Sequence, residues 1–206
     1  KIGYTAPGRT GQQRAIRDAL ARSGISPAEI GMLEAHGPGT PLGDPVEIDA
    51  ISEIYRAADV GPQTVAIGSV KGNVGHLDTA AGIASLIKTV LAVNTGAIPA
   101  SLHCSPANPR IGFAATPFSP VEQTAEWPAR FERRMAAISP FGIRGTNCHM
   151  IVGAAETPAP TAMEDNSDDQ ALVSSAHSPA SLPGGLPAGA PSLRPPALPA
   201  HCATAA

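Results

Sequence analysis

In the stretch Glu34-Ala35-His36-Gly37-Pro38-Gly39-Thr40, a histidine and two glycines follow a short apolar run, Ile30 to Leu33. The stretch Lys71-Gly72-Asn73-Val74-Gly75-His76 has a similar layout after a second apolar run, Val65 to Val70. Glycine lets the backbone turn sharply and approach a ligand closely. Two such turns, each at the end of an expected strand (Ile30 to Ala35 and Val65 to Val70), predict one active site with two imidazole donors.

Helices are expected around these strands. The pattern from Gly11 to Ser23 is helical, and Gly24 is a typical helix stop. A second helix is expected from Asp44, with Asp44 as its N-cap and Glu47 completing a capping box. A long helix is expected from about Asp78 to Asn94, and its apolar residues are predicted to face inward: Ile83, Leu86, Ile87, Val90 and Leu91.

The remainder of the chain predicts loops, two late strands and a tail. Pro99 to Pro128 is rich in proline and is predicted as loop. Arg134 to Ser139 and Asn147 to Gly153 are predicted as an antiparallel pair of strands. Alternating strands and helices predict a layered α/β fold. From about residue 154 the apolar periodicity is lost, so we predict a folded part, residues 1–153, and a disordered Pro/Ala/Gly-rich tail, residues 154–206.

The composition excludes several functional classes. The formal net charge is −3 and there is no basic run, so no nucleic-acid partner is expected. No apolar run approaches the roughly 18–20 residues of a membrane span, and no signal peptide opens the chain, so we expect a cytoplasmic protein without a membrane partner. The first residue is not Met, which suggests a start within a larger domain. The three cysteines are too scattered for a disulfide framework or a metal site: Cys104, Cys148 and Cys202.

A third block, Phe141-Gly142-Ile143-Arg144-Gly145-Thr146-Asn147-Cys148-His149, completes an ordered set of motifs. Together, the three blocks resemble the C-terminal half of a β-ketoacyl synthase domain, and most closely the ketosynthase domains of modular type I polyketide synthases. Those domains carry Glu-Ala-His-Gly-Thr-Gly-Thr, Lys-x-Asn-x-Gly-His and Phe-Gly-x-x-Gly-Thr-Asn-x-His blocks in this order. The resemblance extends from Lys1 to about Val152. It implies the C-terminal half of a thiolase-like α/β domain, whose complete form has αβαβα layers.

The resemblance also implies a reaction, the decarboxylative Claisen condensation of acyl and malonyl-type thioesters that elongates polyketide or fatty acyl chains. It assigns His36 and His76 to stabilisation of the enolate oxygen that decarboxylation creates, and Lys71 to charge and hydrogen bonding near His76. The backbone N–H of Ile143 would help to form an oxyanion hole, and the hydroxyl of Thr40 would contact the phosphopantetheine arm. No tightly bound cofactor is implied, since the arm of an acyl carrier protein carries the substrate, and that protein is the expected partner.

The nucleophile of the family lies in a Thr-Ala-Cys-Ser-Ser block, and nothing in these 206 residues matches it. Neither Cys104 nor Cys148 occupies its position. We expect a missing N-terminal ketosynthase half or a homologous protomer to supply it. One alternative is a catalytically inactive remnant that binds a carrier protein or another partner. Another is an incomplete gene product with no role of its own.

Three positions depart from the family blocks. Pro38 replaces a threonine, Gly72 replaces a serine or threonine, and Arg144 replaces a small residue. We interpret these departures as relaxed constraint. The remaining histidines of this region, His103 and His149, are expected to be structural.

Overall fold

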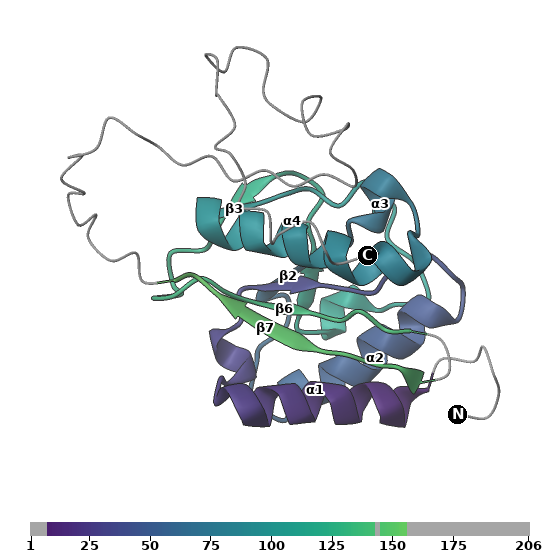
Figure 1. Cartoon of the computed structure of the whole chain (residues 1–206), viewed down its shortest axis with the longest axis horizontal. Coiled ribbons are helices and arrows are strands. Elements are labelled where there is room, and N and C mark those ends of the chain that lie inside the picture. Colours follow the sequence, from purple (N-terminus) through teal and green to yellow (C-terminus); the bar gives the residue numbers. More distant parts are fainter. Residues whose placement is uncertain (1–7, 143–144, 156–206) are drawn as a thin grey trace, which may run out of the picture. The chain divides into compact units, whose positions relative to one another are not determined.

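The computed structural model describes residues 8–142 and 145–155, in which a sheet lies between two layers of helices (Figure 1). In the main sheet, β1 pairs in parallel with β2 and with β6, β2 pairs in parallel with β4, and β7 runs antiparallel to β6. The predicted α/β layering and the antiparallel pair of late strands are confirmed. The strands, in their order across the sheet, are β4 (Phe118–Pro120), β2 (Val65–Gly68), β1 (Met32–Glu34), β6 (Met135–Ile138) and β7 (Met150–Gly153).

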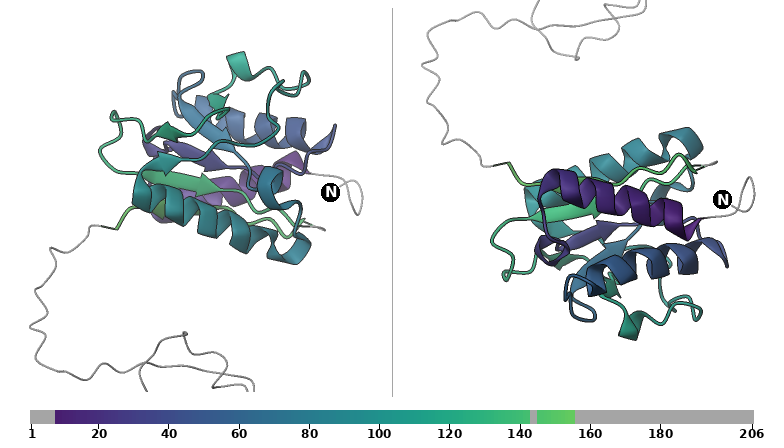
Figure 2. Two further views of the ribbon diagram at one scale, coloured as in Figure 1. Left: turned by 90° about the horizontal axis from the view of Figure 1, so that it is seen from above. Right: turned by 90° about the horizontal axis from the view of Figure 1, so that it is seen from below.

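Helices cover both faces of this sheet (Figure 2). On one face, α1 (Arg9–Ser23) packs against α2 (Gly43–Arg56), and α1 ends at Gly24 as predicted. On the other face, α4 (Ala81–Thr95) contacts β6 and β7. The shorter elements are η1 (Pro27–Glu29), α3 (Lys71–Val74), η2 (Asp78–Ala80), η3 (Phe113–Ala115) and a two-stranded sheet of β3 (Ala97–Ile98) and β5 (Ala125–Glu126).

Buried side chains on both faces hold the central strand in place. Successive residues of a strand point to opposite faces of its sheet. Accordingly Leu33 joins the core cluster that includes Ile16, Ile51 and Tyr55 of α1 and α2, whereas its neighbour Met32 joins the cluster that includes Val93 of α4. Because side chains cover β1 on both faces, the carboxyl end of this strand is held firmly in place. The turn that carries His36 begins there.

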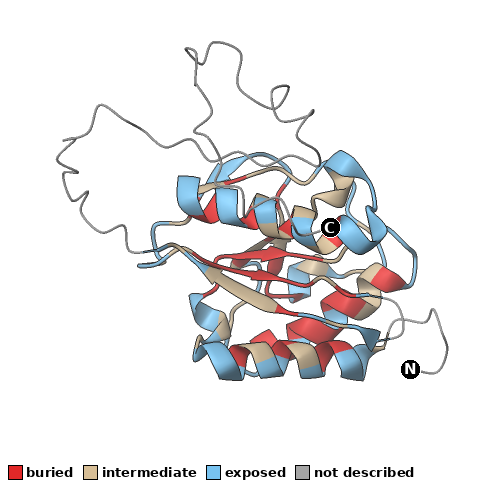
Figure 3. Ribbon diagram, viewed as in Figure 1, coloured by how far each residue is buried: buried red, intermediate tan, exposed pale blue. Residues whose placement is uncertain are grey.

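The predicted inward face of α4 is wrong. Most of the residues that point inward are small or polar (Figure 3). Of the five residues predicted to face inward, Leu86 is half-buried, Val90 is 37% exposed, and Ile83, Ile87 and Leu91 are 55%, 55% and 58% exposed. The polar groups on the inner face are satisfied locally, since the Thr89 hydroxyl donates to the Ser85 carbonyl at 2.8 Å. Small side chains let the helix lie close to the sheet, and this leaves the larger apolar side chains outside. The buried residues of α4 are Ala81, Ser85, Thr89, Ala92 and Val93.

Two further predictions about elements are wrong. Strands β4 and β5 both lie within the segment predicted as loop, residues 99–128. Helix α2 has Leu42 rather than Asp44 as its N-cap, and the N–H of Gly43 donates to the Thr40 hydroxyl oxygen at 2.9 Å. The predicted tail lies outside the described residues apart from Ala154 and Ala155, and so do Ile143 and Arg144. Among the helices that the structure describes, none has the length and apolarity needed to cross a membrane.

Candidate active site

The two histidine turns meet at the carboxyl edge of the main sheet. His36 follows β1, while β2 leads into α3, after which comes His76. Because β1 and β2 are parallel neighbours, their ends lie side by side. The two imidazole rings are 5.3 Å apart between centroids at an interplanar angle of 84°, and the ring of Phe141 lies 6.1 Å from that of His36. The structure therefore brings together the two histidines that the sequence motifs single out.

The two imidazoles have different surroundings, which affect them in different ways. The backbone N–H of Asp78 donates to Nδ1 of His76 at 3.1 Å, so the neutral ring carries its proton on Nε2. Burial lowers the pKa of His36, the nearby Lys71 and His76 act in the same direction, and together they bring it to about 4. His36 is thus a neutral imidazole near pH 7. It can therefore donate one N–H without carrying a charge.

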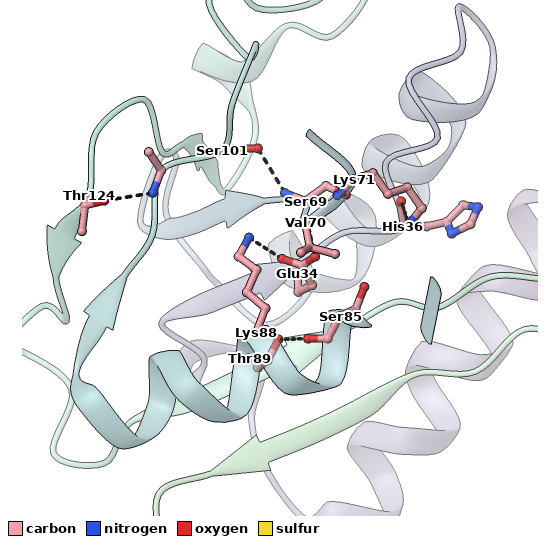
Figure 4. Close-up of polar contacts among 11 residues, drawn as sticks. Glu34, His36, Ser69, Val70, Lys71, Ser85, Lys88, Thr89, Ser101 and Thr124 are labelled. Atoms are coloured by element: carbon pink, nitrogen blue, oxygen red, sulfur yellow. Dashed lines mark hydrogen bonds and ion pairs between the residues drawn. The ribbon is translucent and has the colours of Figure 1, made fainter. Parts of the chain in front are cut away.

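Lys71 connects α3 to the turn that carries His36. Its ammonium donates to the backbone carbonyl of His36 (Figure 4). The sequence places this ammonium near His76, whereas the contact that the structure gives it is to His36. Burial lowers the pKa of Lys71, and this effect is opposed by three carboxyl groups: Glu47, Glu34 and Asp44.

The backbone of the His36 turn is held by acidic side chains of α2. The two carboxyl oxygens of Glu47 accept from the N–H groups of His36 at 2.7 Å and Gly37 at 3.0 Å, and Asp44 accepts from Gly39 at 3.0 Å. Burial raises the pKa of Glu47 to about 7 against the effect of these hydrogen bonds. Sequence reasoning missed this role, because the spacing of Asp44 and Glu47 also fits a capping box. The backbone donors of this half-buried turn are given acceptors by the two carboxyl groups.

A buried ion pair holds the end of β2. Glu34 is fully buried, and its Oε2 lies 2.7 Å from Nζ of Lys88 on α4. Its Oε1 accepts from the N–H of Val70, the residue before Lys71, at 2.7 Å (Figure 4). Burial raises the pKa of Glu34, and the lysine opposes that rise. Sequence reasoning missed this pair too, although a glutamate in a buried strand and a lysine within an apolar helix were visible signals.

A cavity of about 510 Å³ opens beside the two turns. The loop after β3 closes one side, and its Ser101 hydroxyl accepts from the N–H of Ser69 at 3.1 Å. Thr40 is not among the lining residues. Burial raises the pKa of the Cys104 thiol, which disfavours the thiolate form. The lining includes Pro38, Gly39, Lys71, His76, His103 and Cys104.

Gly72 is a steric requirement in this arrangement. A Cβ atom at this position would lie 2.7 Å from the carbonyl oxygen of Leu102, so any larger residue would displace the loop that closes the cavity. This contact gives glycine a packing role at position 72, and the interpretation of the three departures as relaxed constraint stays a prediction. Pro38 is also closely packed, since a Cβ on Gly43 would lie 2.8 Å from its ring.

The other candidate ligands and histidines lie apart from this chemistry. Nδ1 of His149 is 3.0 Å from the Ser139 hydroxyl in a buried pair, which fits the structural role expected from the sequence. His103 is exposed in the cavity loop, and Cys148 is exposed too. Within residues 8–142 and 145–155, no three His, Cys, Asp or Glu side chains gather as a metal ion would require.

Comparisons with known proteins identify the class to which this fold and edge-of-sheet site belong. Ketosynthase twelve of the bacillaene polyketide synthase of Bacillus amyloliquefaciens superposes with a TM-score of 0.73 at 39% identity, over 76% of this chain and 28% of that one. The fold is thus that of the thiolase-like ketosynthases. The family model for the β-ketoacyl synthase C-terminal domain matches residues 1–105, and that for the ketoacyl-synthetase C-terminal extension matches residues 107–188. The chain belongs to the β-ketoacyl synthase family.

Curated relatives of this chain include large polyketide synthases. The phenolphthiocerol synthesis polyketide synthase type I Pks15/1 of Mycobacterium bovis is 42% identical over 77% of this chain. Polyketide synthase GfsA of Streptomyces halstedii is 44% identical over 73% of it. The chain spans only 8% and 2% of these two relatives.

Proposed function

We propose that this chain supplies the decarboxylating part of a ketosynthase site, in which His36 and His76 stabilise the enolate of a malonyl-type thioester. The observation that carries the proposal is the pair of imidazole rings, 5.3 Å apart at the ends of adjacent strands. Loss of carbon dioxide leaves negative charge on the thioester oxygen, and two fixed N–H donors lower the energy of that charge. The neutral ring of His36 suits this task because its N–H donor does not depend on protonation at pH 7.

Lys71 has a supporting role in this proposal. Its ammonium holds the carbonyl of His36 and brings positive charge toward the developing enolate. Glu47 and Glu34 fix the two turns from behind, so neither imidazole has to reorganise during the reaction. The N–H of Ile143, which lies outside the described residues, keeps its proposed place in the oxyanion hole for the acyl group.

The substrate in this proposal arrives on the phosphopantetheine arm of an acyl carrier protein. The cavity that reaches Lys71 and His76 provides a channel beside the histidines. Thr40 is exposed near its entrance, and its oxygen accepts from Gly43, so the hydroxyl proton can turn to a carbonyl of the arm. The family has a threonine at the position of Pro38, and proline has no hydroxyl. Thr40 is therefore the one residue of the block from Glu34 to Thr40 that can offer a hydroxyl to the arm.

The nucleophile comes, in this proposal, from an N-terminal ketosynthase half or a homologous protomer. Cys104 is poorly suited because burial raises the pKa of its thiol. The exposed apolar side chains of α4 offer a surface on which such a partner would pack.

The test uses this chain in complex with a cysteine-bearing ketosynthase half. We expect His36→Ala or His76→Ala to lower malonyl decarboxylation by about 10²–10³-fold, the usual effect of removing one oxyanion donor. Acylation of the cysteine should fall less in His36→Ala, because that step develops no enolate. His177→Ala, in the C-terminal segment, is the control. Decarboxylation that is unchanged in both active-site variants would reject the assignment, and a complex that binds carrier protein without turnover would favour the binding-module alternative.

A further inference from the structure

A second cleft, of about 430 Å³, lies between α2 and the loop from residue 110 to 116. It shares Ile48 and Ile111 with the cavity beside the histidines, so the two spaces have a common apolar wall. Its polar side chains are concentrated on the two elements that form it. They are Asp49, Ser52 and Arg56 of α2, with Arg110 and Thr116 of the loop.

The two arginines give this cleft a net positive charge. Arg56 donates through Nη2 to the Ala115 carbonyl at 2.9 Å, and Arg110 donates through Nη1 to the Pro41 carbonyl at 3.2 Å. Each contact uses one of the five N–H groups of a guanidinium, so it orients the side chain and leaves donors for a ligand. The carboxylate of Asp49 is paired with Arg9 at 2.9 Å, which offsets its negative charge.

A buried hydroxyl in the same cleft points to a ligand as well. Ser52 is fully buried, and its Oγ has no hydrogen-bond partner among the described residues. A buried polar atom without a partner costs free energy, so such atoms normally have a protein or solvent partner. An acceptor oxygen bound in the cleft would give this hydroxyl a partner once the atoms that cover it shift.

We propose that this cleft binds a phosphate group. Forked guanidinium donors match the oxygens of phosphate, and charge-assisted hydrogen bonds of this kind are among the strongest in proteins. Because the cleft shares a wall with the cavity beside the histidines, we take the phosphate to be the phosphodiester of the phosphopantetheine arm. This choice of source rests on the function proposed above. Arg110 would then bridge three things at once: its own loop, the Pro41 loop and the arm.

The experiment titrates the full chain with three probes, 4′-phosphopantetheine, pantetheine and inorganic phosphate, by isothermal calorimetry. We expect phosphopantetheine to bind about tenfold or more tightly than pantetheine, as one or two charged hydrogen bonds allow. Arg56→Ala and Arg110→Ala should each remove most of this advantage, and Ser52→Ala a smaller part. Arg14→Ala is the charge-matched control, because its side chain is 84% exposed on α1, pairs with Asp18 at 3.8 Å and does not line the cleft.

Several outcomes would overturn the proposal. If the Arg56→Ala, Arg110→Ala double variant still binds phosphopantetheine more tightly than pantetheine, the phosphate binds elsewhere. If Arg14→Ala loses as much affinity for phosphopantetheine as the cleft variants do, the effect is one of overall charge and the cleft is not a specific site. Binding of inorganic phosphate through both arginines, with no advantage for phosphopantetheine, would overturn the arm as source. Arg110→Lys guards against misfolding, since it keeps the charge and should keep part of the affinity. If phosphate binding depends on the two arginines but the histidine variants leave decarboxylation unchanged, the phosphate site stands and only the proposed function is rejected.

Discussion

At the scale of single residues, the site depends on carboxyl groups that the sequence motifs do not single out. The meeting of His36 and His76 follows from two parallel strands with similar turns, and sequence reasoning reached it. The hydrogen bonds of Glu47 did not follow, because an acidic residue in the first turn of a helix usually serves that helix. Here the carboxyl group of Glu47 accepts hydrogen bonds from the half-buried N–H groups of His36 and Gly37 instead. Which donor lacks an acceptor is a tertiary property that spacing does not encode.

Glu47→Ala should therefore destabilise the chain more than Glu47→Gln. The alanine leaves two half-buried N–H groups without their carboxyl acceptor, at about 1 kcal/mol each, whereas the amide oxygen of glutamine keeps one of the two bonds. Urea unfolding of the full chain measures the difference. Equal stability of the two variants would show that the carboxyl group is not what holds the turn.

The pH dependence of stability gives an independent test of the same residue. Burial raises the pKa of Glu47 from 4.5 to about 7, so the folded chain binds more protons than the unfolded chain between these values. The contribution of Glu47 is then fully present below pH 4.5 and declines as the pH rises to about 7. The stability of the wild type relative to Glu47→Gln should fall across this window. A difference that is flat or rises with pH would contradict the buried, proton-binding carboxyl.

At the scale of elements, the sequence identified those whose periodicity is simple. α1, β1, β2, β6 and β7 were all predicted close to their observed bounds. β4 was missed, because a three-residue strand bounded by prolines shows no alternation. The position of α4 in the sequence was predicted correctly, but the face that packs on the sheet was not. The helix has more apolar residues than one face of the sheet can cover. Hydrophobic periodicity indicates that the apolar face of a helix will be buried. It does not show whether that face packs on the sheet of the same chain or on another protein.

A matched pair of substitutions on α4 tests its orientation. Thr89→Leu adds bulk to a fully buried site and removes the hydrogen bond to Ser85, so it should cost about 1–3 kcal/mol of stability. Ile87→Gln changes a residue that is 55% exposed and should change the stability of the monomeric chain, measured at a concentration too low for self-association, by less than about 0.5 kcal/mol. Thermal unfolding followed by circular dichroism compares the two. The reverse order of effects would mean that the large apolar residues face the sheet after all.

At the scale of the whole molecule, one side of the fold remains apolar and open. The large exposed side chains of α4 and its preceding turn form an outward group: Leu77, Ile83, Ile87, Val90 and Leu91. Soluble monomers seldom leave contiguous apolar patches of such size without a partner. The histidine turns open at the amino end of the same helix, so a partner on this surface would also lie next to the proposed enolate site.

The isolated chain should therefore self-associate, and a cysteine-bearing ketosynthase half should suppress that association. Burial of the α4 surface in either complex stabilises the folded state by mass action, so the melting temperature should rise with chain concentration and rise further when the half is added. Ile87→Gln combined with Leu91→Gln should weaken both kinds of complex, while Arg14→Ala should leave both intact. Sedimentation velocity and thermal melts over a hundredfold concentration range measure this. A monomer whose cooperative melt does not depend on concentration would show that the described fold needs no cover on α4, and the partner half would then have to pack elsewhere.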